Sequence, residues 1–107
     1  MAREATPGGL DLLILHLLSE REMYGYEMVT ELEKRSQSVF QLKEGTLYPL
    51  LHRLEKEGAV SAYEERVEGR NRRYYRITRK GRGRLQEQTE NWRSYAAAVN
   101  AVLCSPA

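Results

Sequence analysis

The sequence predicts a mainly α-helical fold with one small β-hairpin and a long helix at its C-terminal end. Leucines recur at helical spacing through the first half of the chain, and β-forming residues flank a short turn between residues 60 and 78. Beyond residue 85, apolar residues recur every seven positions. The 107 residues fit one structural unit, which we divide into a compact part, 1–78, and a C-terminal helix, 79–107.

The first helix is expected over residues 10–20. Its apolar residues cover more than one face of a helix: Leu10, Leu12, Leu13, Ile14, Leu15, Leu17 and Leu18. A helix that is apolar nearly all round is buried nearly all round. Because a domain of this size is thin, we expect the second face, with Leu10, Leu13 and Leu17, to contact another chain.

The second helix is expected to open at Tyr24-Gly25-Tyr26 and to run to about Ser36. Its buried face carries Met28, Val29 and Leu32. A loop over residues 36–43 follows, and we expect its apolar residues to hold it against the core: Val39, Phe40 and Leu42.

The third helix gives the clearest pattern. Its leucines follow the i, i+3, i+4, i+7 spacing: Leu47, Leu50, Leu51 and Leu54. Because proline is tolerated in the first turn of a helix, Pro49 predicts a start between Glu44 and Thr46. Thr46 is the expected N-cap, and Gly58 is the expected C-terminal stop.

A hairpin is expected from two strands, Val60–Arg66 and Arg72–Thr78. The turn covers residues 67–71, where Gly69 and Asn71 suit unusual backbone angles. Nine basic residues lie between positions 66 and 84, and only Glu68 opposes them. This asymmetry indicates a polyanionic partner for the hairpin.

The last helix is expected to begin after an N-cap at Thr78 and to reach about Leu103. Its apolar residues form a seam of the heptad type: Leu85, Trp92, Tyr95 or Ala96, Val99, and Val102 or Leu103. This seam lies past the compact part of the chain. Its natural partner is therefore a second copy of the same helix, which predicts a homodimer.

The order of three helices, a hairpin and a helix is that of a winged helix-turn-helix. In this fold the third helix enters the major groove of double-stranded DNA, and the hairpin is the wing. Candidate DNA contacts at the third helix are its outward residues and the preceding lysine: Lys43, Glu44, Thr46, Tyr48, Pro49, His52 and Arg53. Candidate contacts on the wing are Arg70, Asn71, Arg72 and Arg73.

Two other classes of function are open. A winged-helix interaction module without DNA binding would suit the acidic second helix and the apolar seam. An enzyme is disfavoured, because two histidines and one cysteine form neither a nucleophile motif nor a metal-ligand cluster. We therefore expect no metal and no cofactor. The short apolar stretches predict no membrane span, and the lone Cys104 favours a reducing, cytoplasmic location.

The chain resembles the PadR family of bacterial transcriptional regulators from Leu10 to about Leu103. The strongest segment is FQLKEGTLYPLLHRLEKEG, residues 40–58. Two further segments support it: LDLLILHLLSEREMYGYEM, residues 10–28, and RRYYRIT with Thr78 and Gly81. The single C-terminal helix is similar to the short subfamily. Ala59 departs from the family pattern, in which a larger aliphatic residue is usual.

The resemblance implies a repressor-type homodimer on a pseudo-palindromic operator. It also implies that Gly45–Pro49 starts the recognition helix and that the wing contacts the DNA backbone. In some multidrug-responsive members, an aromatic residue on the last helix lines a cavity between protomers. Trp92 stands at a comparable place, so the resemblance implies that Trp92 contacts a small aromatic or hydrophobic effector.

Overall fold

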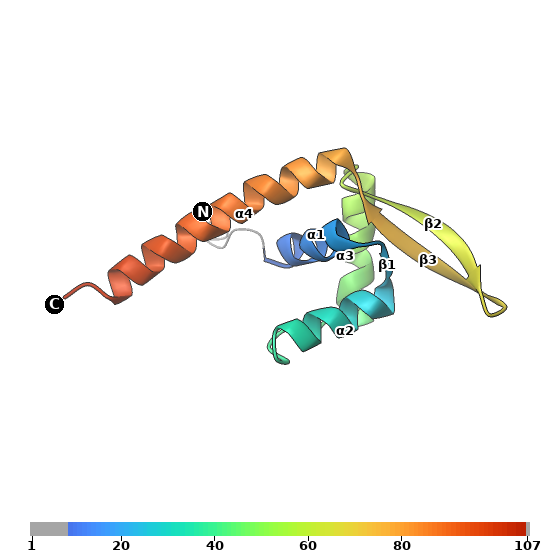
Figure 1. Cartoon of the computed structure of the whole chain (residues 1–107), viewed down its shortest axis with the longest axis horizontal. Coiled ribbons are helices and arrows are strands. Elements are labelled where there is room, and N and C mark those ends of the chain that lie inside the picture. The colour runs from blue at the N-terminus through green and yellow to red at the C-terminus, as the bar shows by residue number, and fades with distance from the viewer. Residues whose placement is uncertain (1–8, 107) are drawn as a thin grey trace.

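Within residues 9–106, which the computed structural model describes, the chain forms four helices and a three-stranded antiparallel sheet (Figure 1). In chain order the elements are α1 (Gly9–Glu20), β1 (Met23–Tyr24), α2 (Gly25–Arg35), α3 (Glu44–Lys56), β2 (Val60–Val67), β3 (Arg70–Ile77) and α4 (Arg79–Leu103). The predicted architecture of three helices, a hairpin and a long final helix is confirmed.

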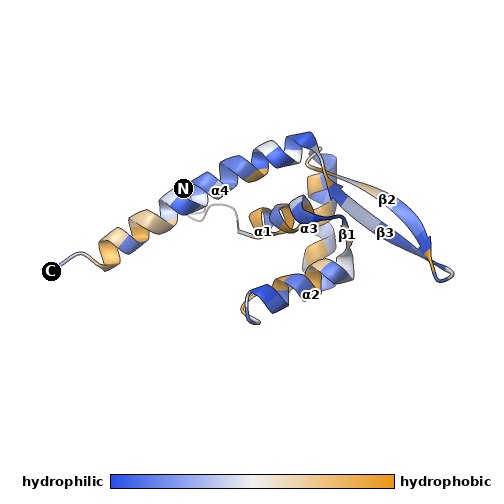
Figure 2. Cartoon of the chain, in the orientation of Figure 1, coloured by the Kyte–Doolittle hydropathy of each residue, from blue (hydrophilic) through white to orange (hydrophobic). Residues whose placement is uncertain are grey.

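The hydrophobic core lies where α1, α2 and α3 meet the base of the hairpin. The inner face of α3 supplies the leucines that the sequence predicted: Leu47, Leu50, Leu51 and Leu54. Full burial of such a side chain stabilises the fold by about 1.5–3 kcal/mol. Figure 2 shows a second concentration of apolar residues in the C-terminal part of α4, which extends away from this core.

The sheet has one strand more than the sequence predicted. β1 pairs with β3 through Met23↔Tyr75 and Tyr24↔Tyr74, which gives the order β1-β3-β2. A strand of two residues is too short for an alternating pattern to reveal it. Because β1 pairs with β3 and is followed at once by α2, it joins the wing directly to the start of α2.

The turn of the hairpin is tighter than predicted. Val67 pairs with Arg70, so only Glu68 and Gly69 form the turn, with φ angles of 51° and 78°. Two consecutive residues with positive φ match the right-handed twist of a hairpin. Asn71 was expected in the turn, but it lies in β3 opposite Arg66.

Two expectations about the segment before α3 are corrected. The N-cap is Lys43, whose carbonyl accepts from the Thr46 and Leu47 N–H groups at 3.0 and 2.9 Å, so Thr46 lies inside the helix. Val39 and Phe40 are exposed and do not hold the loop to the core, whereas Leu42 packs against it.

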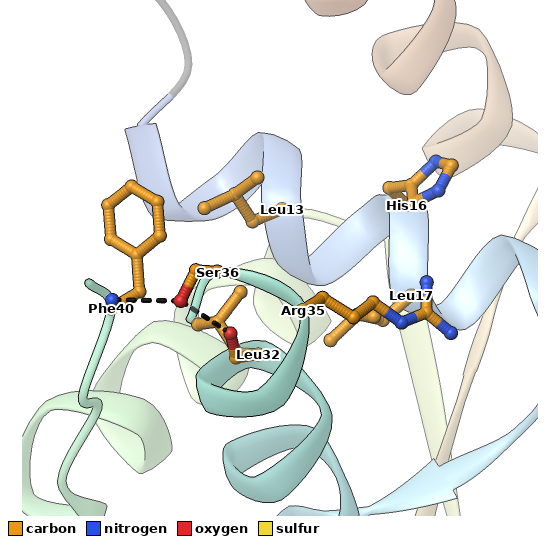
Figure 3. A pocket seen from close by; sticks show the side chains of 7 residues that line it. All are labelled: Leu13, His16, Leu17, Leu32, Arg35, Ser36 and Phe40. Carbon is orange, nitrogen blue, oxygen red and sulfur yellow. Dashed lines mark hydrogen bonds between the residues drawn. The ribbon is translucent and has the colours of Figure 1, made fainter. Parts of the chain in front are cut away.

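Hydrogen bonds at Ser36 order the start of this loop instead. The Ser36 hydroxyl donates to the Leu32 carbonyl at 2.7 Å and accepts from the Phe40 N–H at 2.9 Å (Figure 3). The chain reverses between these bonds through Gln37 and Ser38, which have φ angles of 54° and 68°.

The start of α4 docks tightly against the end of α3. Thr78 is the N-cap, as predicted, and its hydroxyl accepts from the Gly81 N–H at 3.0 Å. The same hydroxyl donates to the Gly58 carbonyl at 2.6 Å. Gly58, with a φ of 82°, ends α3 as predicted. A Cβ at Gly81 would overlap the Ala59 carbonyl oxygen, so the Thr78–Gly81 pair is explained by this close approach.

Replacing Gly81 by alanine should lower the free energy of unfolding by about 1–3 kcal/mol, because overpacking forces the backbone apart. Gly83 is the matched control, since it lies in the same helix and a Cβ there meets nothing within 4 Å. Gly83→Ala should instead raise the free energy of unfolding by up to about 1 kcal/mol. Urea denaturation measures both, and equal shifts of the same sign would refute the close approach.

Candidate nucleic-acid interface

The N-terminal half of α3 presents a continuous exposed surface. The predicted contacts that are exposed here are Lys43, Glu44, Gly45, Thr46, Tyr48, Pro49 and His52. They lie opposite the buried leucines, as a helix with one apolar stripe requires. The structure therefore brings all of these predicted α3 contacts to one accessible region of the molecule.

Tyr48 is half exposed and also serves as a packing residue. A Cβ at Gly25 would overlap the Tyr48 hydroxyl, so the side chain of Tyr48 lies against the first residue of α2. Burial, and then the charge of Glu44, raise the pKa of the Tyr48 phenol. The hydroxyl therefore stays protonated and can donate a hydrogen bond. This contact accounts for the glycine in the Tyr24-Gly25-Tyr26 segment.

Arg53 is exposed on α3, as the sequence predicted, but its guanidinium is held toward α1. Its Nη2 atom lies 2.7 Å from Oδ1 of Asp11 on α1, and its Nη1 atom lies 3.5 Å from Oε1 of Glu57. The hydrogen bond that Arg53 donates to Asp11 is the largest cause of the raised pKa of Arg53. Arg53 is thus engaged with α1 on the flank of α3.

Lys56 was missed by the sequence reasoning. It is exposed and lies four residues after His52, so both side chains share one face of α3. That spacing was the signal that could have identified it. Lys56 adds a cation to the C-terminal end of the exposed surface.

The outer face of the wing carries an aromatic cluster made of Tyr24, Tyr63 and Tyr74. Tyr74 stacks on Tyr63 with ring centroids 5.6 Å apart and meets Tyr24 edge-on at 5.4 Å. The guanidinium groups of Arg72 and Arg76 cover the rings of Tyr24 and Tyr63 at 4.4 and 4.7 Å. Such contacts favour a fixed position for each cation.

The cluster is tied to the body of the protein through Glu22. The Tyr63 hydroxyl donates to Oε1 of Glu22 at 2.5 Å, and this bond raises the pKa of Tyr63 to about 12. The wing is therefore attached to the segment just before β1 as well as to β1 itself.

Arg73 lies on the opposite face of β3 and is already paired. Its Nη2 atom lies 3.2 Å from Oε2 of Glu55 on α3, and its Nη1 atom lies 3.7 Å from Oε2 of Glu64 on β2. Arg70 and Asn71 are exposed near the tip. The four predicted wing contacts therefore differ. Arg70, Asn71 and Arg73 are exposed, although Arg73 also faces two carboxylates, whereas Arg72 is half buried and rests on an aromatic ring.

The predicted seam of α4 divides into two parts. Leu85 packs against the core of its own chain, whereas Trp92, Tyr95 and Val99 are exposed. Val102 and Leu103 are 74% and 75% exposed. A shallow hollow of about 310 Å³ on this part of the helix is lined by Tyr95, Ala98, Val99, Val102 and Leu103.

The predicted second face of α1 is only partly available. Leu17 is 2% exposed, so its own chain already covers it and it offers almost no surface to a partner, contrary to the expectation. Leu10 and Leu13 are half buried. Leu13 lines an open pocket of about 360 Å³ between α1, α2 and the following loop, with Leu17, Leu32, Phe40, His16, Arg35 and Ser36 (Figure 3).

Two kinds of feature are missing from residues 9–106, a metal centre and a membrane-spanning helix. This part of the chain holds no group of three histidine, cysteine or acidic side chains arranged to bind a metal ion. In the same part, none of the helices combines the length and the apolar character that a membrane crossing needs.

Residues 14–87, which include the exposed α3 surface and the wing, match the family described as "Transcriptional regulator PadR-like family". The chain belongs to this family. The winged helix described above is thus the DNA-binding fold of a transcriptional regulator, and the family is one of regulators, not of enzymes.

Known proteins of the same kind cover most of the chain. The transcriptional regulator Rv3488 of Mycobacterium tuberculosis is 39% identical over 85 residues, 79% of this chain and 77% of that protein. A PadR-like transcriptional regulator from Bacillus cereus is 36% identical, with a TM-score of 0.80 over 91% of this chain and 93% of that one. A PadR family regulator from Clostridium difficile is 34% identical, with a TM-score of 0.77 over 90% of this chain and 99% of that one.

Proposed function

We propose that this chain is a cytoplasmic repressor that binds a pseudo-palindromic operator as a homodimer. The observation that carries the proposal is the exposed N-terminal half of α3 beside a basic wing. The repressor role follows the family resemblance, and a dimer seated on promoter DNA would exclude other proteins from the same site.

In this proposal α3 enters the major groove with its first turns nearest the bases. Thr46 and Tyr48 offer hydroxyl groups to base edges or phosphates, and Pro49 offers an apolar surface to a thymine methyl group. Lys43 and Lys56 flank this surface and neutralise phosphates. The tip of the wing, with Arg70, reaches the adjacent backbone or minor groove.

The dimer is proposed to form through the exposed apolar part of α4. Val99, Val102 and Leu103 lie far from the core of their own chain, and apolar side chains gathered on a projecting helix indicate a protein partner. A two-fold axis makes such an interface self-complementary, so it presents two copies of α3 to two half-sites.

Fluorescence anisotropy on labelled duplexes that tile the chain's own upstream region tests the function. We expect saturable binding to one tile at two chains per duplex and weaker, salt-sensitive binding to random duplex. The alternative, an interaction module without a role on DNA, predicts no salt-sensitive affinity for any duplex. That result would overturn the proposal.

Variants of Arg72 and Arg73 test which arginine of the wing contacts a DNA phosphate. Arg72→Gln should weaken binding to operator and random duplex alike and reduce the log–log salt slope by about 0.9, the value for one lost phosphate contact. Arg73→Gln should change the slope less, because Glu55 and Glu64 already hold this guanidinium. A larger effect of Arg73 than of Arg72 would contradict this assignment.

Introducing a charge at the tip of α4 should separate the two chains. We expect Val102→Asp to give monomers by light scattering and to lose operator binding, because a carboxylate would be buried in an apolar interface. Ala97→Glu is the control, since its position on α4 lies on the opposite face from Val99. A Val102→Asp protein that remains dimeric would place the interface elsewhere.

An effector site at Trp92 is the second part of the proposal. The Trp92 and Tyr95 rings lie 6.0 Å apart on the exposed part of α4, beside the hollow formed by Val99 and Val102. An aromatic effector stacked there would quench the single tryptophan and weaken operator binding. Titration with an anilinonaphthalene sulfonate dye, followed by both signals, tests this. Unchanged signals would exclude that class of compound.

A further inference from the structure

Four charged side chains of alternating sign connect three helices along one flank of α3. Asp11 of α1 accepts from Arg53 of α3 at 2.7 Å, and Arg53 lies 3.5 Å from Glu57 at the C-cap of α3. Glu57 in turn accepts from Nη1 of Arg84 on α4 at 2.8 Å. We call these residues, Asp11, Arg53, Glu57 and Arg84, the inter-helix charge chain.

The charge chain lies on the flank of α3 that faces away from the wing. Arg53 and Glu57 are four residues apart and share that flank, while Glu55 points to the wing through Arg73. Arg84, followed by Arg53, holds the pKa of the Glu57 carboxyl below its usual value. The carboxylate is thus charged at neutral pH, and the chain of contacts remains intact.

The contact between Glu57 and Arg84 joins the recognition helix to α4 directly. α4 has 25 residues, so its far end lies about 37 Å from its start at 1.5 Å per residue. A rotation of about 5° at the start of such a helix moves its end by about 3 Å, close to the 3.4 Å spacing of successive base pairs. Small changes of this angle therefore change the distance between two recognition helices by the size of one base-pair step.

We propose that the inter-helix charge chain fixes the angle between α3 and α4 and thereby selects the spacing of the two operator half-sites. This inference rests on the proposed function, because it needs a dimer on two half-sites. The four residues are positioning residues, and they select spacing without touching DNA. Breaking one link leaves each half-site readable and widens the range of spacings that the dimer accepts.

The test uses a two-half-site duplex selected from a random library by the wild-type protein. Anisotropy then gives the affinity for this duplex and for duplexes with one base pair added or removed between the half-sites. We expect the wild type to prefer the selected spacing by about tenfold, the cost of one poorly matched base pair. In Glu57→Gln and Arg84→Gln this preference should fall by about three- to fivefold, the range of a surface ion pair.

Two further variants make the readout specific. Arg84→Lys keeps the positive charge facing Glu57 and should retain most of the preference. Arg21→Gln is the matched control, because Arg21 pairs with Glu27 at 3.3 Å with a side-chain exposure of 51%, close to the 49% of Arg53. The hydrogen bonds of these two side chains go to residues 22–27 and not to α3 or α4, so loss of the pair should leave the spacing preference unchanged.

Three other outcomes of this experiment would each contradict one of the claims above. If the wild type prefers one spacing and Glu57→Gln and Arg84→Gln keep that preference, the charge chain has no positioning role. If Arg21→Gln widens the spacing range equally, the effect is a general loss of stability and the inference fails. If the wild type selects no paired half-sites, the proposed function fails, and this inference fails with it.

Discussion

One peptide group, the carbonyl of Ala59, is the point on which the arrangement of the functional elements depends. It accepts the Thr78 N–H at 3.0 Å, and Gly81 approaches it so closely that a side chain there would overlap it. The Ala59 N–H donates to the Leu54 carbonyl at 2.9 Å. The end of the recognition helix, the base of the wing and the start of the projecting helix therefore meet within a few ångströms. Ala59 is fully buried in this junction, where an aliphatic residue larger than alanine is usual in the family.

The arginines show why a cluster of charge in the sequence is not the same as a charged surface. Within the basic segment, Arg73, Arg76 and Arg84 each face a carboxylate from another element. The pairs of Arg73 and Arg76 hold the wing to its neighbours, and the pair of Arg84 joins α4 to the end of α3. Exposed positive charge near the tip of the wing remains at Arg66 and Arg70. The residues that orient the wing and those available to a polyanion are therefore largely different residues of one segment.

Features set by neighbours in the sequence were predictable, and features set by distant partners were not. The leucine stripe of α3 and the Thr78 cap follow from local spacing and local hydrogen bonds, so both predictions are confirmed. β1 has two residues and exists only because β3 lies beside it. Arg53 is exposed, as predicted, but its pairing with Asp11, 42 positions earlier, does not follow from local spacing. Periodicity assigns a residue to a face but does not name the partner on that face.

The heptad seam of α4 is a second case in which periodicity does not identify the partner, because its two ends lie in different surroundings. Leu85 is covered by the chain's own core, while Val102 and Leu103, at the far end, are about three-quarters exposed. The longest dimension of the molecule, 62 Å, reflects this projecting helix. Its base is fixed by Thr78, Gly81 and Arg84 against the end of α3. If a second copy packs on the far part of α4, the angle between α3 and α4 therefore sets how that copy lies relative to α3. The exposed far part of α4 and the exposed half of α3 are thus mechanically connected through one junction, without a separate linker domain between them.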